Sequence, residues 1–169
     1  KILNKYKLSN NYFFLPNHLW KNKNHIVVLK ALNYLKKKVN IKIVASGHFN
    51  DHRNPHHSTK IMNYINSHNL NKNFIHLGIL PFEEMISLIL RSVAVINPSK
   101  SEGWSNTVEQ AKSLGKKVIL SDIQTHKEQI DKNFFYFKSD SFVQLANVML
   151  GLNHKFKKPK NFTKNYQIY

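Results

Sequence analysis

The sequence predicts an α/β fold: a Rossmann-like parallel sheet with helices on both faces. Short apolar runs alternate along the chain with longer segments in which apolar residues recur at helical spacing. The short runs are apolar at consecutive positions, which is typical of strands buried on both faces of a parallel sheet. Ligands of such sheets bind at the carboxyl ends of the strands. A site is therefore expected in the loops 16–24, 46–57, 78–81, 98–106 and 121–126.

The first half of the chain is expected to contain three strands joined by two helices. Each strand is an apolar run that ends at a proline or at a glycine-containing turn. The helix after the first strand has apolar residues at helical spacing. In chain order the expected elements are strand 12–15, helix 25–35, strand 41–45, helix 61–70 and strand 74–77.

The second half continues the alternation from Pro81, a residue that suits the first turn of a helix. Glu83 and Glu84 follow in that turn, where the helix dipole favours carboxylates. Gly115 is expected to end a later helix. The expected elements are a helix from 81, strand 93–96, helix 107–114, strand 118–120, strand 134–137 and helix 142–150.

The length of 169 residues suits one Rossmann-like domain, expected over 1–152, followed by a basic tail over 153–169. The chain has no cysteine, which excludes a disulfide scaffold, a cysteine-based zinc site and a cysteine nucleophile. No segment resembles a signal peptide or a transmembrane helix, so a cytoplasmic location, at or near the inner face of the membrane, is expected. Because the chain begins with Lys1, we expect it to be part of a longer protein.

The formal net charge is +17, and Asp51 is the only acidic residue among the first 80 positions. Such a charge predicts an anionic partner, which is nucleic acid, an anionic membrane or a phosphorylated ligand. The lysines are spread along the chain without a recognised nucleic-acid-binding signature, so no specific nucleic-acid partner is expected. Lys, Asn, Ile and Phe are all abundant, as in AT-rich coding sequence, so part of the charge is expected to reflect composition.

The loop after the fourth predicted strand carries the clearest chemical signal. A helix that starts there presents free N–H groups and a positive dipole end, which together bind anions. Gly103 lets a ligand approach the backbone closely, and Glu102 beside it can accept hydrogen bonds from sugar hydroxyls. Two structural alternatives stay open. Asn106 and Glu109 fit a capping box, and Trp104 could serve in ordinary packing.

Four motifs occur in order along the chain. They are Pro16-Asn-His-Leu-Trp-Lys-Asn-Lys-Asn-His25, Gly78-Ile-Leu-Pro81, Pro98-Ser-x-x-Glu-Gly-Trp-Ser with the continuation Glu-Gln-Ala-Lys-Ser-Leu-Gly, and Ser121-Asp122 with His126-x-Glu128. Together they resemble the family 4 retaining glycosyltransferases, over roughly residues 10–150. The resemblance implies the C-terminal, donor-binding half of a GT-B architecture, in which two Rossmann-like domains enclose the active site.

The resemblance also implies a function. The domain would bind a nucleotide-diphospho sugar and, with an N-terminal acceptor domain missing from this chain, transfer a hexose to a glycan or lipid-linked acceptor. The form of the first motif is similar to a subset that often handles mannosyl donors. No metal or other cofactor is implied, and the isolated domain is expected to be inactive.

The implied catalytic residues are Glu102, which would bind donor-sugar hydroxyls, and Lys23, which would neutralise the departing diphosphate. The turn 78–80 would face the nucleobase. The implied donor-binding residues are His18, Gly78, Ile79, Leu80, Ser99, Gly103, Trp104, Ser105, Asn106 and Gln110.

Two positions depart from the family pattern. The family has a second glutamate eight residues after the first, where this chain has Gln110. Its neighbour Glu109 should point about 100° away around the helix, and an amide oxygen accepts a weaker bond than a carboxylate. The family also commonly has an arginine before the lysine, near the place of His18, whose charge depends on pH. Both departures predict weaker donor binding.

Several further histidines follow predicted strands. His48, His52, His56 and His57 lie around Asp51 in one loop, but their spacing matches no compact metal motif, so a flexible polar loop is expected. His126 follows a strand and could approach the ligand. The alternatives to a glycosyltransferase are a basic nucleic-acid-binding module and a sugar-nucleotide epimerase of the same fold, and the Glu102–Gly103 loop favours the transferase.

Overall fold

The computed structural model describes residues 1–9, 11–129 and 132–156. In this part of the chain six strands form one sheet in the order β3-β2-β1-β4-β5-β6, with parallel pairing throughout. The predicted Rossmann-like parallel sheet is therefore confirmed. The strands are β1 (Tyr12–Leu15), β2 (Lys42–Ala45), β3 (Phe74–His76), β4 (Val95–Asn97), β5 (Val118–Ser121) and β6 (Phe134–Phe137).

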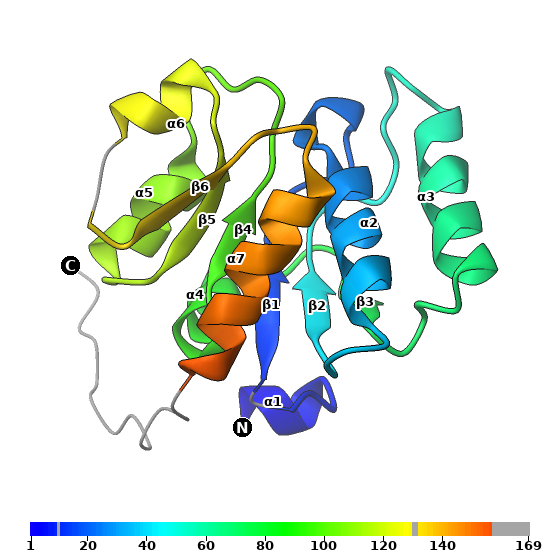
Figure 1. Cartoon of the computed structure of the whole chain (residues 1–169), viewed down its shortest axis with the longest axis horizontal. Coiled ribbons are helices and arrows are strands. Elements are labelled where there is room, and N and C mark those ends of the chain that lie inside the picture. The colour runs from blue at the N-terminus through cyan, green and yellow to red at the C-terminus, as the bar shows by residue number, and fades with distance from the viewer. Residues whose placement is uncertain (10, 130–131, 157–169) are drawn as a thin grey trace.

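Helices cover both faces of the sheet (Figure 1). Figure 1 shows α2 and α7 in front of the strands, and these two helices pack against each other. None of the described helices is long and apolar enough to cross a bilayer. The helices are α1 (Ile2–Lys5), α2 (His25–Leu35), α3 (His56–Ser67), α4 (Phe82–Arg91), α5 (Asn106–Ser113), α6 (Gln124–Glu128) and α7 (Phe142–His154), with a 3₁₀ helix η1 (Lys21–Lys23).

Strand β1 shows why the strand sequences are continuously apolar. Phe13 and Leu15 belong to the core that includes side chains of α2, α3 and α7. Tyr12 and Phe14 face the opposite way and join side chains of α4 and α5. Because successive residues of a strand point to opposite faces, a strand between two helical layers must be apolar at every position.

The boundaries of some elements differ from those expected. Helix α3 begins at His56, so His56 and His57 belong to a helix and not to the preceding loop. The short elements α1, η1 and α6 were not expected, because fewer than two helical turns show no apolar period. Helix α7 continues to His154, and Phe156 packs against the core. The fold thus extends past residue 152, and the predicted tail lies outside the described residues from 157 onward.

The order of the strands determines where the loops meet. The sheet grows from β1 to β2 and β3 on one side, and through β4, β5 and β6 on the other. Phe14 of β1 lies opposite Val95 of β4. The loops after these two strands therefore leave the sheet next to each other, at a reversal of strand order, which is where open α/β sheets bind ligands.

Acid is expected to destabilise the fold through buried histidines. His25 is fully buried at the start of α2, and this burial lowers its pKa from 6.5 to about 3. Between these values only the unfolded chain takes up the proton. Stability is therefore complete above about pH 6.5 and falls as the pH is lowered, by up to about 1.4 kcal/mol per pH unit for His25.

Urea unfolding between about pH 7 and about pH 4 measures this loss. The His25→Leu variant should show a shallower dependence of the unfolding free energy on pH. His56→Leu, at an exposed histidine, is the control. Equal slopes in His25→Leu and the wild type would contradict the assignment.

Gly151→Ala is expected to stabilise the domain. Gly151 lies exposed within α7, and a Cβ there would meet no atom within 4 Å. Alanine restricts the unfolded backbone, so the free energy of unfolding should rise by about 0.5–1 kcal/mol. Gly115→Ala is the opposite case, because φ is +62° there and alanine should lower stability. Urea unfolding of both variants checks the two signs.

Candidate functional site

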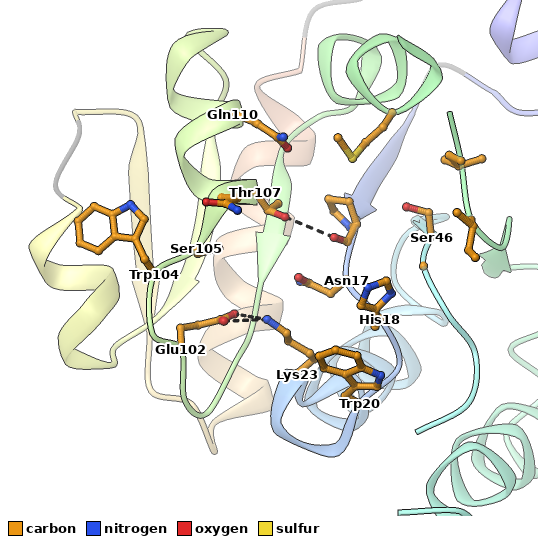
Figure 2. Close-up of a pocket in the computed structure, with 16 residues that line it drawn as sticks. Asn17, His18, Trp20, Lys23, Ser46, Glu102, Trp104, Ser105, Thr107 and Gln110 are labelled. Carbon is orange, nitrogen blue, oxygen red and sulfur yellow. Dashed lines mark hydrogen bonds and ion pairs between the residues drawn. The ribbon is translucent and has the colours of Figure 1, made fainter. Parts of the chain in front are cut away.

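A cavity of about 490 Å³ opens at the carboxyl ends of the strands (Figure 2). Its walls come from the loops after β1, β2, β3 and β4 and from the first turns of α4 and α5. Nine of the expected site residues line it: His18, Lys23, Ile79, Leu80, Glu102, Trp104, Ser105, Asn106 and Gln110. The lining residues that were not expected are Pro16, Asn17, Trp20, Ser46, Gly47, Met85 and Thr107.

The side chains of Lys23 and Glu102 meet in this cavity, as Figure 2 shows. The Nζ atom of Lys23 lies 2.7 Å from both carboxylate oxygens of Glu102. The two side chains are only 16% and 8% exposed. Each charge offsets the cost of removing the other from water, so loss of one partner leaves the second poorly compensated. A ligand that binds either group must therefore replace or complement the other.

A buried group of polar side chains supports Glu102 from behind. The amide of Asn97 donates to the hydroxyl of Ser105 at 2.7 Å, and its oxygen accepts from the amide of Asn17 at 3.3 Å. The hydroxyl of Ser99 lies 2.6 Å from Oε1 of Glu102 and 2.9 Å from Oδ1 of Asn97. Because this hydroxyl has one proton, it donates to one of them at a time. Through these contacts, the end of β4 positions the carboxylate.

The predicted capping box at Asn106 and Glu109 is wrong. Helix α5 begins at Asn106 with Ser105 as its N-cap, and no described side chain caps it. Ser105 is held differently, because its hydroxyl accepts from Asn97. The carboxylate of Glu109 accepts from Nε2 of Gln129 at 2.9 Å instead. The positive end of α5 is left open toward the cavity, where Asn106 is a lining residue.

Gln110 and Glu109 lie on different sides of α5. Gln110 lines the cavity, and Glu109 is bound to Gln129 away from it. The cavity therefore receives an amide at this position, and Glu102 is the only carboxylate among its lining residues.

His18 forms part of the wall and is held by the loop after β2. Its Nδ1 accepts from the backbone N–H of His48 at 2.8 Å, which leaves the ring proton on Nε2. Burial, followed by the proximity of His48 and Lys23, lowers the pKa of His18 below 6.5. The ring is thus neutral at pH 7. It can donate one hydrogen bond from Nε2 but adds no positive charge to the cavity.

Three of the expected residues do not line the cavity. Ser99 is buried behind Glu102. Gly103 is not part of the wall. The carbonyl of Gly78 accepts from the backbone N–H of Gly47 at 2.8 Å, so this turn presents its next two residues to the cavity.

Trp104 and His126 do not lie where the sequence suggested. Trp104 is 54% exposed, so it is not packed in the core. Figure 2 shows its indole directed away from Lys23 and Glu102, at the rim of the cavity. His126 is fully buried and in hydrogen-bond contact with Ser121, and it does not line the cavity.

Asn24 is a structural residue of the site that the sequence did not reveal. Its backbone is left-handed, with φ of 56°, a conformation that asparagine tolerates better than most residues. Its amide donates to the carbonyl of Pro98 at 3.1 Å and to that of Ser139 at 2.8 Å. The first bond attaches the segment that carries Lys23 to the loop that carries Glu102, and the second attaches it to the loop between β6 and α7.

Among the residues that the structure describes, no group of three or more His, Asp or Glu side chains is placed to hold a metal ion, and this includes the histidine-rich loop. Asp51 organises this loop by accepting hydrogen bonds from the backbone N–H groups of Lys21 and Arg53.

The strand order alone does not identify a class of protein, because many Rossmann-like domains with different functions share it. The chain belongs to the family "Glycosyl transferases group 1", whose profile matches residues 3–168. This membership confirms the resemblance seen in the sequence motifs. No curated protein matches the chain significantly in sequence.

Solved structures share the fold at low sequence identity. HepE from Anabaena is 16% identical with a TM-score of 0.80, over 91% of this chain and 42% of HepE. A glycosyltransferase from Rickettsia africae is 22% identical with a TM-score of 0.77, over 89% of this chain and 40% of that protein. The C-terminal domain of LpcC from Francisella tularensis is 19% identical with a TM-score of 0.75, over 91% of this chain and 84% of that domain. The chain thus spans less than half of the first two proteins.

Gly47→Ala is expected to distort the His18 wall. A Cβ at Gly47 would lie 2.8 Å from the backbone nitrogen of His18 and 2.9 Å from its Cα, and φ is +126°. Amide NMR shifts should therefore spread from Gly47 into the loop after β1, and the melting temperature should fall. Gly151→Ala, which meets no atom within 4 Å, is the control. Shifts confined to the immediate neighbours of Gly47 would contradict this prediction.

Proposed function

We propose that this domain binds the nucleotide-diphospho sugar of a retaining glycosyltransferase and, with an acceptor domain outside these 169 residues, transfers a hexose to a glycan or lipid-linked acceptor. The observation that carries the proposal is the Lys23–Glu102 pair in a cavity at the carboxyl ends of β1 and β4. Family membership favours a transferase over an epimerase or a nucleic-acid-binding module.

The two charges have complementary roles in this proposal. Glu102 accepts hydrogen bonds from sugar hydroxyls, and Lys23 stabilises the negative charge that develops on the departing diphosphate. In the free domain the two side chains are bound to each other. An arriving diphosphate attracts Lys23 and frees the carboxylate oxygens for the sugar. The open end of α5 adds a second source of positive potential, and no metal cofactor is required.

The remaining lining residues suggest how the nucleoside is held. Gln110 is placed to accept from ribose hydroxyls, and Ile79 and Leu80 offer apolar surface to the base. His18 can donate from Nε2 to a phosphate oxygen. HepE was crystallised with UDP and with UDP-glucose, so UDP-sugars are the first donors to test. GDP-mannose is the next, because the first motif resembles that of mannosyl enzymes. Cytoplasmic location and contact with an anionic membrane stay predictions.

Calorimetric titration of the chain with UDP-, GDP- and ADP-sugars tests this proposal. Glu102→Gln removes the charge and keeps the shape. It should weaken the preferred nucleotide sugar by about tenfold or more, because hydrogen bonds to a charged group contribute about 1.5–3 kcal/mol. The matching nucleoside diphosphate should bind the variant at least as well, since it has no sugar for Glu102 to hold. Lys23→Met should weaken the binding of both the nucleotide sugar and the nucleoside diphosphate.

Glu128→Gln, at an exposed position on α6, is the matched control. If no nucleotide sugar binds the wild type, or if Glu102→Gln behaves like this control, the assignment of the donor site fails. Circular dichroism of each variant shows whether lost affinity merely reflects unfolding.

A further inference from the structure

A second cavity of about 520 Å³ lies on the same two loops as the Lys23–Glu102 pair. It is lined by Lys21 on η1 and by Lys100 in the loop after β4, each two residues before a member of that pair. The two loops are joined here, because the backbone N–H of Lys100 donates to the carbonyl of Asn22 at 2.8 Å. The second cavity therefore adjoins the first along these loops.

The wall of the second cavity is positively charged. Lys21, Arg53 and Lys100 line it, from three different loops. Neither lysine forms an ion pair within the described part of the chain. The single acidic lining residue is Asp51, whose side chain is shielded from solvent.

Asp51 is engaged by the protein itself. Its carboxylate accepts from the backbone N–H of Lys21 at 2.9 Å, from that of Arg53 at 3.1 Å and from the amide of Asn54 at 3.1 Å. These donors lower the pKa of Asp51 to about 2, the bond from Lys21 being the largest cause. Asp51 therefore holds the loop in shape as a carboxylate. Its charge offsets one of the three cations, and the lining keeps an excess of positive charge from Lys21 and Lys100.

Arg53 is held in place by an aromatic ring and a carboxylate. Its guanidinium lies over the ring of Trp20, 4.7 Å from the ring centre, and its Nε lies 3.6 Å from Oδ1 of Asp51. Its side chain is nevertheless 54% exposed. Stacking on an aromatic ring restricts the guanidinium without using its outer N–H groups, which match the oxygens of a phosphate.

We propose that this second cavity is a subsite for a phosphate group carried by a ligand other than the nucleotide sugar. Within the proposed transferase that ligand is the acceptor, and this part of the inference rests on the proposed function. The position suits the role, since a phosphate here would hold its carrier beside Lys23 and Glu102.

Amide NMR of the labelled chain tests the subsite with inorganic pyrophosphate as the probe, at constant ionic strength. Amides of Lys21, Arg53 and Lys100 report on the second cavity, and those of Ile79 and Gln110 report on the first. We expect saturable shifts at the second cavity that persist when UDP fills the first. The double variant Lys21→Gln/Lys100→Gln should weaken this binding by about tenfold, as expected for lost charge-assisted bonds.

The matched control is Lys37→Gln/Lys72→Gln, which removes the same charge from exposed positions near the amino ends of the strands. Arg53→Lys keeps the charge but loses the fork and the stacking, so it should give an intermediate loss. Equal weakening in the two double variants, or displacement of pyrophosphate from the second cavity by UDP, would overturn the proposal.

The two proposals can fail separately. If pyrophosphate binds the second cavity but no nucleotide sugar binds the first, the phosphate subsite stands and the proposed transferase donor site is refuted. If nucleotide sugar binds the first cavity and pyrophosphate shifts only first-cavity amides, the subsite is refuted and the donor site stands.

Discussion

The parallel pairing of β1 with β4 is the constraint on which the site depends. Phe14 lies opposite Val95, so two loops that are distant in sequence leave the sheet side by side. Asn24 then joins them through its bond to the carbonyl of Pro98. Only this arrangement brings Lys23 within 2.7 Å of Glu102. A charge pair so little exposed depends on accurate placement, because a partner displaced from it leaves a poorly solvated charge.

The +17 charge is distributed between surface and site. Lys23 is neutralised by Glu102 in the free domain, and Lys116 donates to the carbonyls at the end of α4, where burial lowers its pKa to about 8. These lysines serve the fold or the first cavity. Lys21 and Lys100 instead form no ion pair within the described chain and line the second cavity together with Arg53. The fold thus gathers these positive charges from separate loops into one cavity.

Much of the fold was predictable from local sequence, because a strand covered by helices on both faces must be apolar throughout. The tetrapeptide of β1 shows this, as all four residues are buried. Lys23, Glu102 and Gln110 were identified by motif order and do line the cavity. Asn17 and Ser46 were missed, because a polar residue in a loop carries no signal of what it will face.

The capping box is a local motif that the sequence predicted but the structure does not contain. Asn106 and Glu109 have the right spacing, and an isolated helix would satisfy its end with them. In the fold, the amide of Asn97 donates to the hydroxyl of Ser105, and the amide of Gln129 donates to the carboxylate of Glu109. Hydrogen bonds to distant residues, and not local spacing, therefore determine the contacts at the start of α5.

The class of fold, the family motifs and the loops that line the cavity follow from the sequence, because apolar periodicity and turn residues act over a few neighbouring positions. Which side chains meet depends instead on the folded structure. Glu102 became paired and Glu109 turned away, His18 became a neutral donor, and the histidine-rich loop became organised by Asp51. These outcomes depend on burial and on contacts between distant segments, which determine charge state and direction only after the sheet has formed.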